Sequence, residues 1–395
     1  MRRSPKVLCA AILLCTLAFL TAANAAVPRA GNVYIVLLEN TSYSQALGGS
    51  SMPWLKNVAT QYTTATNYYA NTHPSIGNYF MLTTGRIITN SDGYSQTVTA
   101  DNLVRRFLSA GITWKAYAQS LPYAGYTGGD KYPYIKHHNP FAYFSDVRNS
   151  STQKMNIVPF TQFAKDLSNS ATPEFSFIIP NNQNNAHDCP KGMSSCSTSQ
   201  KLRAADDWLK ANIAPLLSSS HFQQDGLLAV VFDESSSGDK AYGGGHVAMV
   251  LAGPKVRRGY KLTNFYQHQN LLRMASEALG LTSFLGAAAS ASNLSSVFGS
   301  DPSCVANSID HTVSICAPTA GASYSSPLRV TARATSSTGV NTMAIYLDGM
   351  KAHTVSGSNS LDTYISATRG SHRLTVQAWD KQGRTFKSTI YTSVN

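Results

Sequence analysis

The segment GNVYIVLLEN, residues 31–40, begins with a glycine, continues as an apolar run and ends in Glu39 and Asn40. A continuous apolar run of this length is typical of a strand buried on both faces of a parallel sheet. Similar runs recur in FSFIIP, residues 175–180, and in GLLAVVFDE, residues 226–234. The sequence therefore predicts a buried sheet whose strands come from distant parts of the chain.

Segments with a helical pattern alternate with these runs; they are SMPWLKNVATQY (51–62), KLRAADDWLKANIAPLL (201–217) and QNLLRMASEALGL (269–281). Alternating strands and helices predict a mostly parallel α/β sheet flanked by helices. Ligands of such sheets bind outside the carboxyl ends of the strands. Three polar pairs fall at or soon after such ends: Glu39 with Asn40, His187 with Asp188, and Asp233 with Glu234.

The pattern changes after about residue 298. The segment GSDPSCVANSID (299–310) is small and polar, and beyond it apolar residues alternate along short segments broken by Gly and Ser. This predicts a β-sandwich of immunoglobulin type. The predicted inward-facing residues are Leu328, Val330, Ala332, Met343, Ile345, Leu347, Leu374, Val376 and Ala378. His353 and His372 are expected on polar strand faces in contact with solvent.

The first 25 residues have a basic start, an apolar stretch and small residues at Ala23 and Ala25. This pattern indicates a secretory signal peptide cleaved after Ala25; an uncleaved N-terminal anchor is the alternative. The predicted organisation is a signal peptide (1–25), an α/β domain (26–299), a linker (300–312) and a sandwich (313–395). The expected location is secreted or periplasmic.

Charge and cysteine content fit an exported protein. The formal charge of +12 falls to +9 without the three basic residues of the signal, and no Lys/Arg run marks a dedicated nucleic-acid binder. Four cysteines remain after cleavage, which allows three disulfide pairings. Short loops favour pairing Cys189 with Cys196 and Cys304 with Cys316. A zinc site made by all four cysteines is the alternative.

Ser75 stands where a helix begins, in NTHPSIGNYFMLTTG (71–85). A serine at this position ordinarily caps the helix. A helix N-terminus also suits a phosphate oxyanion, and a hydroxyl there can attack phosphorus beside a divalent metal held by carboxylates. Glu39, Asp233 and Glu234 supply such carboxylates.

Four blocks of the chain together resemble a known family. They are VYIVLLENTSYSQALG (33–48), NTHPSIGNYFMLTTG (71–85), DESSSGDKAYGGGHVAMVLAGP (233–254) and YQHQNLLRMASEALGL (266–281). Occurring in this order, they are similar to the bacterial phosphoesterase family, which contains acid phosphatases and phospholipases C within the alkaline-phosphatase-like superfamily. The resemblance covers residues 31–298. It implies an alkaline-phosphatase-like, mostly parallel sheet, followed here by the small immunoglobulin-like sandwich.

The resemblance also implies a metal site and a nucleophile. One divalent ion, of a kind that the sequence does not identify, is expected to bind Glu39, Asn40, Ser75, Asp233 and Glu234. Aligning Asn78 and Gly85 with the superfamily's T-F-P-N turn and the following TG places Ser75 at the nucleophile and leaves Thr72 as the alternative. Ile76 and Gly77 replace the Phe-Pro of that turn. Asn181 and Asn182 stand where two-metal relatives carry an acid, which favours a single ion.

Histidines are the expected proton donors and phosphate contacts. His246 follows a glycine run that lets the backbone approach a ligand, and His187 follows a predicted strand, so both are predicted to be catalytic. His73, Asn78, His138 and Asp188 are candidate substrate-binding residues. For His73 and His138 a structural role is equally open, and Asp188 is open as a ligand, as an orienter of His187 or as a turn residue. His221, His268 and His311 are expected to be structural.

The predicted function is that of an exported, metal-dependent phosphoesterase acting on phosphorylated small molecules or phospholipid head groups through a phosphoserine. The alternative is an inactive α/β domain in a surface-binding or adhesion protein whose sandwich contacts a cell surface or polysaccharide. A sulfatase is a third reading, but HPSIGNY lacks the arginine of the sulfatase motif.

Overall fold

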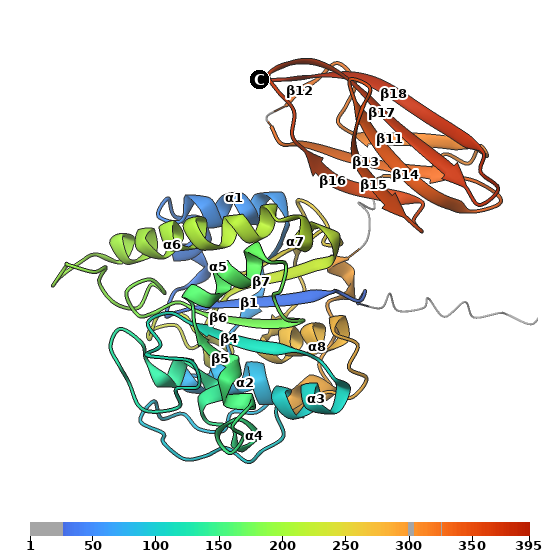
Figure 1. Cartoon of the computed structure of the whole chain (residues 1–395). Coiled ribbons are helices and arrows are strands. Elements are labelled where there is room, and N and C mark those ends of the chain that lie inside the picture. Colours follow the sequence, from blue (N-terminus) through green and yellow to red (C-terminus); the bar gives the residue numbers. More distant parts are fainter. Residues whose placement is uncertain (1–26, 299–303, 325) are drawn as a thin grey trace, which may run out of the picture.

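The computed structural model describes residues 27–298, 304–324 and 326–395. The predicted signal peptide, residues 1–25, lies outside the described residues and stays a prediction. The described chain forms an α/β domain and, C-terminal to it, a β-sandwich (Figure 1).

The α/β domain is built on an eight-stranded sheet. Every pairing within this sheet is parallel except the two pairings of β8. The predicted mostly parallel sheet is therefore confirmed. In spatial order the strands are β5 (Ile157–Pro159), β4 (Trp114–Ala118), β6 (Phe175–Ile179), β1 (Asn32–Leu38), β7 (Gly226–Phe232), β8 (Met249–Ala252), β2 (Thr63–Ala65) and β9 (Lys261–Leu262).

Helices cover both faces of this sheet. In Figure 1, α1, α6 and α7 lie on one side, and α2, α3 and α8 lie on the other. The helices are α1 (Pro53–Gln61), α2 (Ile76–Thr84), α3 (Leu103–Ala110), α4 (Ser145–Arg148), α5 (Thr161–Ser168), α6 (Thr198–Ser218), α7 (Ser220–Asp225) and α8 (His268–Ala278). The three segments with a predicted helical pattern correspond to α1, α6 and α8.

Shorter elements complete the domain. A small parallel pair joins β10 (Tyr266–Gln267) to β3 (Tyr68–Tyr69). Short helical turns are η1 (Ser44–Gly48), η2 (Lys136–His138), η3 (Pro140–Ala142), η4 (Gln153–Asn156), η5 (Ala241–Gly243), η6 (Gly286–Ala289) and η7 (Ser295–Val297).

The register between β1 and β7 decides where the polar pairs lie. The two strands pair in parallel without a shift, from Asn32 opposite Gly226 to Leu38 opposite Phe232. All seven residues of each strand are buried, as the continuous apolar runs predict. Glu39 and Asp233 are the next residues on the two strands, so they leave the sheet side by side at its carboxyl edge.

Helix α1 begins with backbone N–H groups that need acceptors, and α6 supplies them. Pro53 occupies the first helical position, where its missing N–H costs nothing. The carboxylate of the buried residue Asp206, on α6, accepts hydrogen bonds from the N–H groups of Trp54 and Leu55 at 2.9 and 2.8 Å. This side chain therefore joins α1 to α6 and satisfies N–H groups that burial would leave unpaired.

The sandwich consists of a three-stranded and a five-stranded sheet, as predicted. The first contains β11 (Thr312–Ala317), β13 (Leu328–Thr335) and β16 (Ser360–Ile365). The second contains β12 (Ser323–Tyr324), β18 (Thr385–Val394), β17 (Gly370–Asp380), β14 (Val340–Leu347) and β15 (Met350–Ser356). Eight of the nine predicted inward-facing residues are buried, and Leu347 is half-buried.

The expected solvent exposure of His372 is wrong. Its side chain is 6% exposed, and its ring nitrogens contact the Asp348 carboxylate at 2.7 Å and the Thr368 carbonyl at 2.6 Å. A polar partner at each nitrogen allows the imidazole to be buried. His353 is half-buried.

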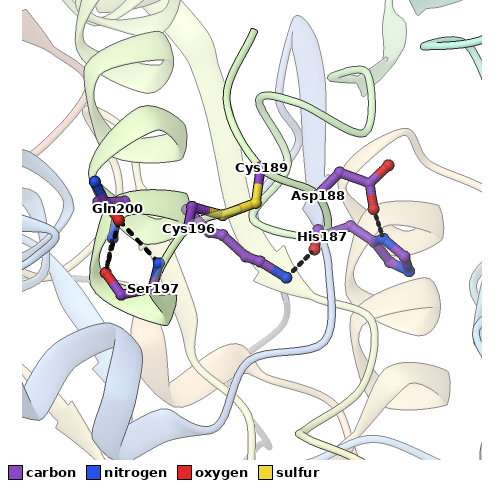
Figure 2. Close-up of a disulfide and its surroundings, with 7 residues drawn as sticks. His187, Asp188, Cys189, Cys196, Ser197 and Gln200 are labelled. Carbon is purple, nitrogen blue, oxygen red and sulfur yellow. Dashed lines mark hydrogen bonds and ion pairs between the residues drawn. A yellow bond between two sulfur atoms is a disulfide. The ribbon is translucent and has the colours of Figure 1, made fainter. Parts of the chain in front are cut away.

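Both expected disulfides are present: Cys189 is bonded to Cys196, and Cys304 to Cys316. The first closes a loop directly before α6 (Figure 2). The alternative zinc site made of all four cysteines is therefore wrong. Within residues 27–298, 304–324 and 326–395, no helix combines the length and apolar character that crossing a membrane requires.

Replacing Asp206 with alanine is expected to lower the free energy of unfolding by about 1–3 kcal/mol, because two buried N–H groups lose their acceptor. Chemical denaturation of the variant and the parent protein measures this difference. The exposed neighbour Asp207 is the matched control, and Asp207→Ala is expected to change stability by less than about 0.5 kcal/mol. Equal losses in the two variants would contradict the role of Asp206.

Candidate active site

Three carboxylates converge at the carboxyl edge of the sheet. Glu39 follows β1, and Asp233 and Glu234 follow β7. Asp233 Oδ1 accepts hydrogen bonds from the backbone N–H of Asn40 at 3.0 Å and from that of Glu234 at 2.6 Å. Exposed fractions of 0% for Glu39 and Asp233 and 6% for Glu234 place all three in the interior. The two strand ends that carry the predicted metal ligands are therefore in contact.

Ser75 points into this carboxylate cluster. Its hydroxyl donates a hydrogen bond to Glu39 Oε2 at 3.0 Å, although 36 residues separate the two in sequence. Desolvation raises the pKa of Asp233, and the nearby Ser75 hydroxyl offsets part of this rise. Ser75 precedes α2 but makes no side-chain capping bond, so the capping role ordinary for this position is not the role it has here.

Other side chains satisfy the start of α2. Asp92 accepts the backbone N–H of Ile76 at 3.2 Å. The amide oxygen of Asn78, a buried residue, accepts the N–H groups of Asn71 and Thr72, and its nitrogen donates to the Thr72 carbonyl at 2.8 Å. Asn78 also reaches Glu234 Oε2 at 3.5 Å. Its amide therefore fixes the turn that carries Ser75, which leaves it less free to bind substrate.

Thr72, the alternative nucleophile, bonds away from the carboxylates. Its hydroxyl contacts Asn90 Oδ1 and the His73 carbonyl, both at 3.1 Å. Of the two candidates, the described contacts bring Ser75 to the carboxylate cluster.

Glu39 has two further neighbours, both at Oε1, the carboxylate oxygen that does not accept the Ser75 hydrogen bond. The Tyr79 hydroxyl donates a hydrogen bond to Glu39 Oε1. His138 Nε2 lies 3.4 Å from the same oxygen and has no hydrogen-bond partner of good geometry. The His138 ring is 2% exposed and stacks on Tyr79 at 5.3 Å between ring centroids. Burial holds the pKa of His138 well below its usual value, so this imidazole is neutral.

Burial and mutual repulsion strongly perturb the cluster. Desolvation, followed by repulsion from Asp233, raises the pKa of Glu39 well above its usual range. Desolvation raises the pKa of Asp233 to about 6, and desolvation with repulsion from Asp233 raises that of Glu234 to about 9. Without a cation, the cluster therefore retains protons near neutral pH.

The donor set fits a hard divalent cation. Among the described residues, the bases within 4 Å of these carboxylates are the imidazoles of His73 and His138; neither lysine nor arginine is there. Asp233 Oδ2 is buried and has no hydrogen-bond partner. Oxygen donors without a fixed counter-charge suit such ions. The described residues contain no ready group of three or more His, Cys, Asp or Glu ligands, so the predicted set depends on Ser75 and Asn40 as well.

His73 connects the cluster to the loop after β7. Its Nδ1 lies 3.1 Å from Glu234 Oε1, and its Nε2 lies 3.0 Å from the Asp239 carbonyl. His73 therefore contacts the carboxylate cluster. Its role in binding substrate stays a prediction. The imidazole spans the gap between the loop and Glu234.

The glycine run before His246 permits a close approach, but to the backbone next to Ser75. A Cβ on Gly243 would lie 2.0 Å from the Asn71 carbonyl oxygen, and a Cβ on Gly244 would lie 2.6 Å from that of Thr72. The run packs directly on the segment leading to Ser75. The glycine run therefore makes the close approach that the sequence predicts, but it approaches this backbone rather than a ligand.

His246 itself is held between aromatic rings. Its imidazole stacks on Tyr43 at 4.6 Å and on Tyr69 at 4.9 Å, and its Nε2 lies 3.1 Å from the Thr66 carbonyl. None of its described side-chain contacts reaches Ser75 or the carboxylates. The catalytic role of His246 stays a prediction.

His187 lies on the loop after β6, next to the disulfide. His187 Nδ1 contacts Asp188 Oδ1 at 2.6 Å, and Lys201 on α6 donates to the His187 carbonyl at 2.7 Å (Figure 2). The His187 ring is 6.3 Å from that of His138. Of the three readings of Asp188, this contact supports that of an orienter of His187.

Two further residues support the carboxylate cluster, and sequence reasoning missed the first of them. Tyr79 lies within the apolar pattern of α2 and therefore reads as a core residue, yet its hydroxyl contacts Glu39. His268 was expected to be structural, and it is fully buried. It bridges the Asp233 carbonyl at 2.6 Å and the Tyr68 hydroxyl at 3.0 Å, which fixes the backbone that carries Asp233.

Two family models match this chain. Residues 41–282 match the Phosphoesterase family and residues 312–376 match a bacterial Ig domain. The expected α/β phosphoesterase domain followed by an immunoglobulin-like sandwich is therefore confirmed.

Several curated proteins are similar to the chain. A "Probable acid phosphatase" of Kluyveromyces lactis is 34% identical over 252 residues, covering 60% of this chain and 56% of that protein. An "Acid phosphatase" of Aspergillus fumigatus is 32% identical over 260 residues, covering 63% and 54%. A "Phosphatidylinositol-3-phosphatase" of Mycobacterium tuberculosis is 29% identical over 266 residues, covering 66% and 80%. The chain thus spans just over half the length of the two fungal relatives.

A solved protein of the alkaline phosphatase superfamily from Vibrio parahaemolyticus is 12% identical and has a TM-score of 0.46, covering 92% of this chain and 83% of that one. The Phosphoesterase model covers well over half of the chain and includes Ser75, Asp233 and Glu234. The chain belongs to the Phosphoesterase family.

Proposed function

We propose that this protein is an exported, metal-dependent phosphoesterase that hydrolyses phosphate esters through a phosphoserine on Ser75. The observation that carries the proposal is the hydrogen bond from the Ser75 hydroxyl to Glu39 Oε2, inside a cluster of three buried carboxylates. Family membership and the relatives named as acid phosphatases support the reaction class. The candidate substrates are phosphorylated small molecules and phospholipid head groups.

One divalent ion would be held by Glu39, Asn40, Ser75, Asp233 and Glu234. When bound, it would act as a Lewis acid toward the serine oxygen and the phosphoryl group. Two observations support this assignment: Asp233 Oδ2 is unpartnered, and no Lys or Arg of the described residues lies beside the carboxylates.

The residues of the chain account for the movement of protons. As Ser75 Oγ bonds to phosphorus, its proton passes to Glu39 Oε2, the acceptor that it already contacts. The bond from phosphorus to the ester oxygen breaks, and that oxygen takes a proton from an imidazole. We assign this donor role to His187, because the Asp188 carboxylate, 2.6 Å from Nδ1, orients its imidazole. Water then attacks phosphorus and gives a proton to the imidazole of His187, while the bond from phosphorus to Ser75 Oγ breaks and Oγ takes its proton back from Glu39.

The alternative is an inactive α/β domain, which would not require the Ser75 hydroxyl to contact Glu39. The serine leaves its capping position unused and turns to a buried acid instead. This contact favours the enzyme over the adhesion protein.

Replacing Ser75 with alanine is expected to lower kcat for a chromogenic phosphate monoester by about a thousandfold or more, because the nucleophile is lost. Chelator treatment of the parent protein is expected to abolish activity, and a divalent ion to restore it. Thr72→Val is the matched control and is expected to lose less than about tenfold. Full activity in Ser75→Ala, with loss in Thr72→Val, would transfer the nucleophile to Thr72.

Acid quenching during turnover of a substrate with labelled phosphate is expected to leave the label on Ser75, where peptide mapping locates it. The Ser75→Ala protein provides the blank. Turnover with no labelled peptide under conditions that slow dephosphorylation would contradict the covalent intermediate.

Stability of the metal-free protein is expected to fall between about pH 5 and pH 8, because Asp233 and Glu234 have raised pKa values. In that window the folded chain retains protons that the unfolded chain has released, so raising the pH favours unfolding. Excess divalent ion is expected to raise the melting temperature most at the higher pH, because it binds the deprotonated carboxylates.

Thermal unfolding in chelator and in added Mg²⁺, Ca²⁺, Mn²⁺ or Zn²⁺ measures this dependence. Glu234→Gln is expected to reduce the slope with pH, and the exposed-site variant Asp207→Asn to leave it unchanged. A constant difference between Glu234→Gln and the parent across the pH range would refute the assigned titration.

A further inference from the structure

We propose that the outer face of the five-stranded sheet of the sandwich binds an acidic polysaccharide. The face carries a groove of about 520 Å³, which we call the sandwich groove. Its lining residues include Thr342, Ala344, Tyr346, Lys351, Trp379 and Lys381.

Strand register places these side chains on one face. Thr342, Ala344 and Tyr346 alternate along β14 with the buried core residues Met343 and Ile345, so they point away from the core. Trp379 lies opposite Thr342 on β17. Thr342 and Tyr346, four residues apart on one strand, are about 13 Å apart along β14. Trp379 and Tyr346 therefore stand near the two ends of the groove.

The small side chain of Ala344 makes the floor between these aromatic residues. Sugar rings present flat C–H faces to aromatic rings, and their hydroxyl groups bond to side chains such as Thr342 and Thr354 along the same groove. An open groove with an aromatic residue near each end suits a chain of rings rather than one small molecule.

The free charges at the sandwich groove are positive. Lys351 and Lys381 line it, and among the described residues neither ammonium group has a carboxylate within 4 Å. The Asp380 carboxylate is fully buried and is bonded to Arg384 and Thr338, so it does not offset them. Charge complementarity therefore selects a polysaccharide that carries carboxylates over a neutral one.

The α/β domain leaves this face open. Between the domains, Arg258 stacks on Tyr62 of the α/β domain at 3.5 Å and on Tyr364 of β16 at 4.7 Å. His353 and Val355 of β15 also face the α/β domain, across a cavity shared with Lys255, and they alternate along the strand with Thr354, which lines the sandwich groove on the opposite face. In Figure 1, β15 and β16 lie nearest the α/β domain. The sandwich groove is lined by sandwich residues, so a long polymer can bind there without meeting the candidate active site.

The test uses the full-length protein with polygalacturonate and with its fully methyl-esterified form, which has the same backbone without the charges. Affinity electrophoresis and calorimetry are expected to show binding of the acid form and at least about tenfold weaker binding of the ester. Trp379→Ala and Tyr346→Ala are each expected to weaken binding of the acid form by about tenfold or more. The double variant Lys351→Gln with Lys381→Gln is expected to lose the preference for the acid form.

Tyr391→Ala removes a tyrosine of β18 that is 63% exposed and is not among the residues that line the groove, and it is expected to keep full affinity. The melting temperature of each variant shows that it is folded, and the lysine variants alter only surface side chains. The proposal is overturned if the parent binds neither polygalacturonate nor alginate, or if it binds the ester equally well. Binding that survives loss of Trp379 and Tyr346, including attachment to anionic vesicles through the lysines alone, also overturns it.

Discussion

The structure of the candidate site depends on the unshifted parallel pairing of β1 and β7. Because Leu38 lies opposite Phe232, the next residues, Glu39 and Asp233, leave the sheet together. A shift of a single residue would turn one of these side chains to the opposite face of the sheet. Burial of both strands on both faces enforces the register, so the core of the domain specifies the meeting of the carboxylates.

Bringing Glu39, Asp233 and Glu234 together has an electrostatic cost, which the described residues offset only in part. Three acids share one buried region, and their pKa values rise by desolvation and mutual repulsion. Hydrogen bonds from Ser75 and Tyr79 to Glu39 and from the backbone to Asp233 relieve part of this cost. A chain optimised only for stability would replace such a cluster with apolar residues. The electrostatic cost of the cluster therefore supports the proposal that it binds a cation.

The sequence predicted the strands, and the polar residues at their ends, better than it predicted which side chains contact each other. Continuous apolar runs identified β1, β6 and β7, and the location of ligands at strand ends placed Glu39 near Asp233. Nothing in the run IGNYFMLTT distinguished Tyr79 from the core residues around it, because its hydroxyl partner is 40 residues away in sequence. The glycines before His246 indicated a close approach but could not name what is approached. Such assignments require knowledge of which loops meet, and sequence periodicity does not contain it.

The two domains present different chemistry on different sides. In the α/β domain, buried acids that no described Lys or Arg neutralises create a region that favours a cation. In the sandwich, exposed lysines beside aromatic side chains create a region that favours an anion. Arg258 lies between the domains, 6% exposed, with its guanidinium on the rings of Tyr62 and Tyr364. The α/β domain meets β16 and the inner side of β15, whereas the sandwich groove lies on the outer side of the five-stranded sheet and is lined by sandwich residues alone. Attachment through the groove would then leave the carboxylate cluster accessible to small phosphorylated molecules.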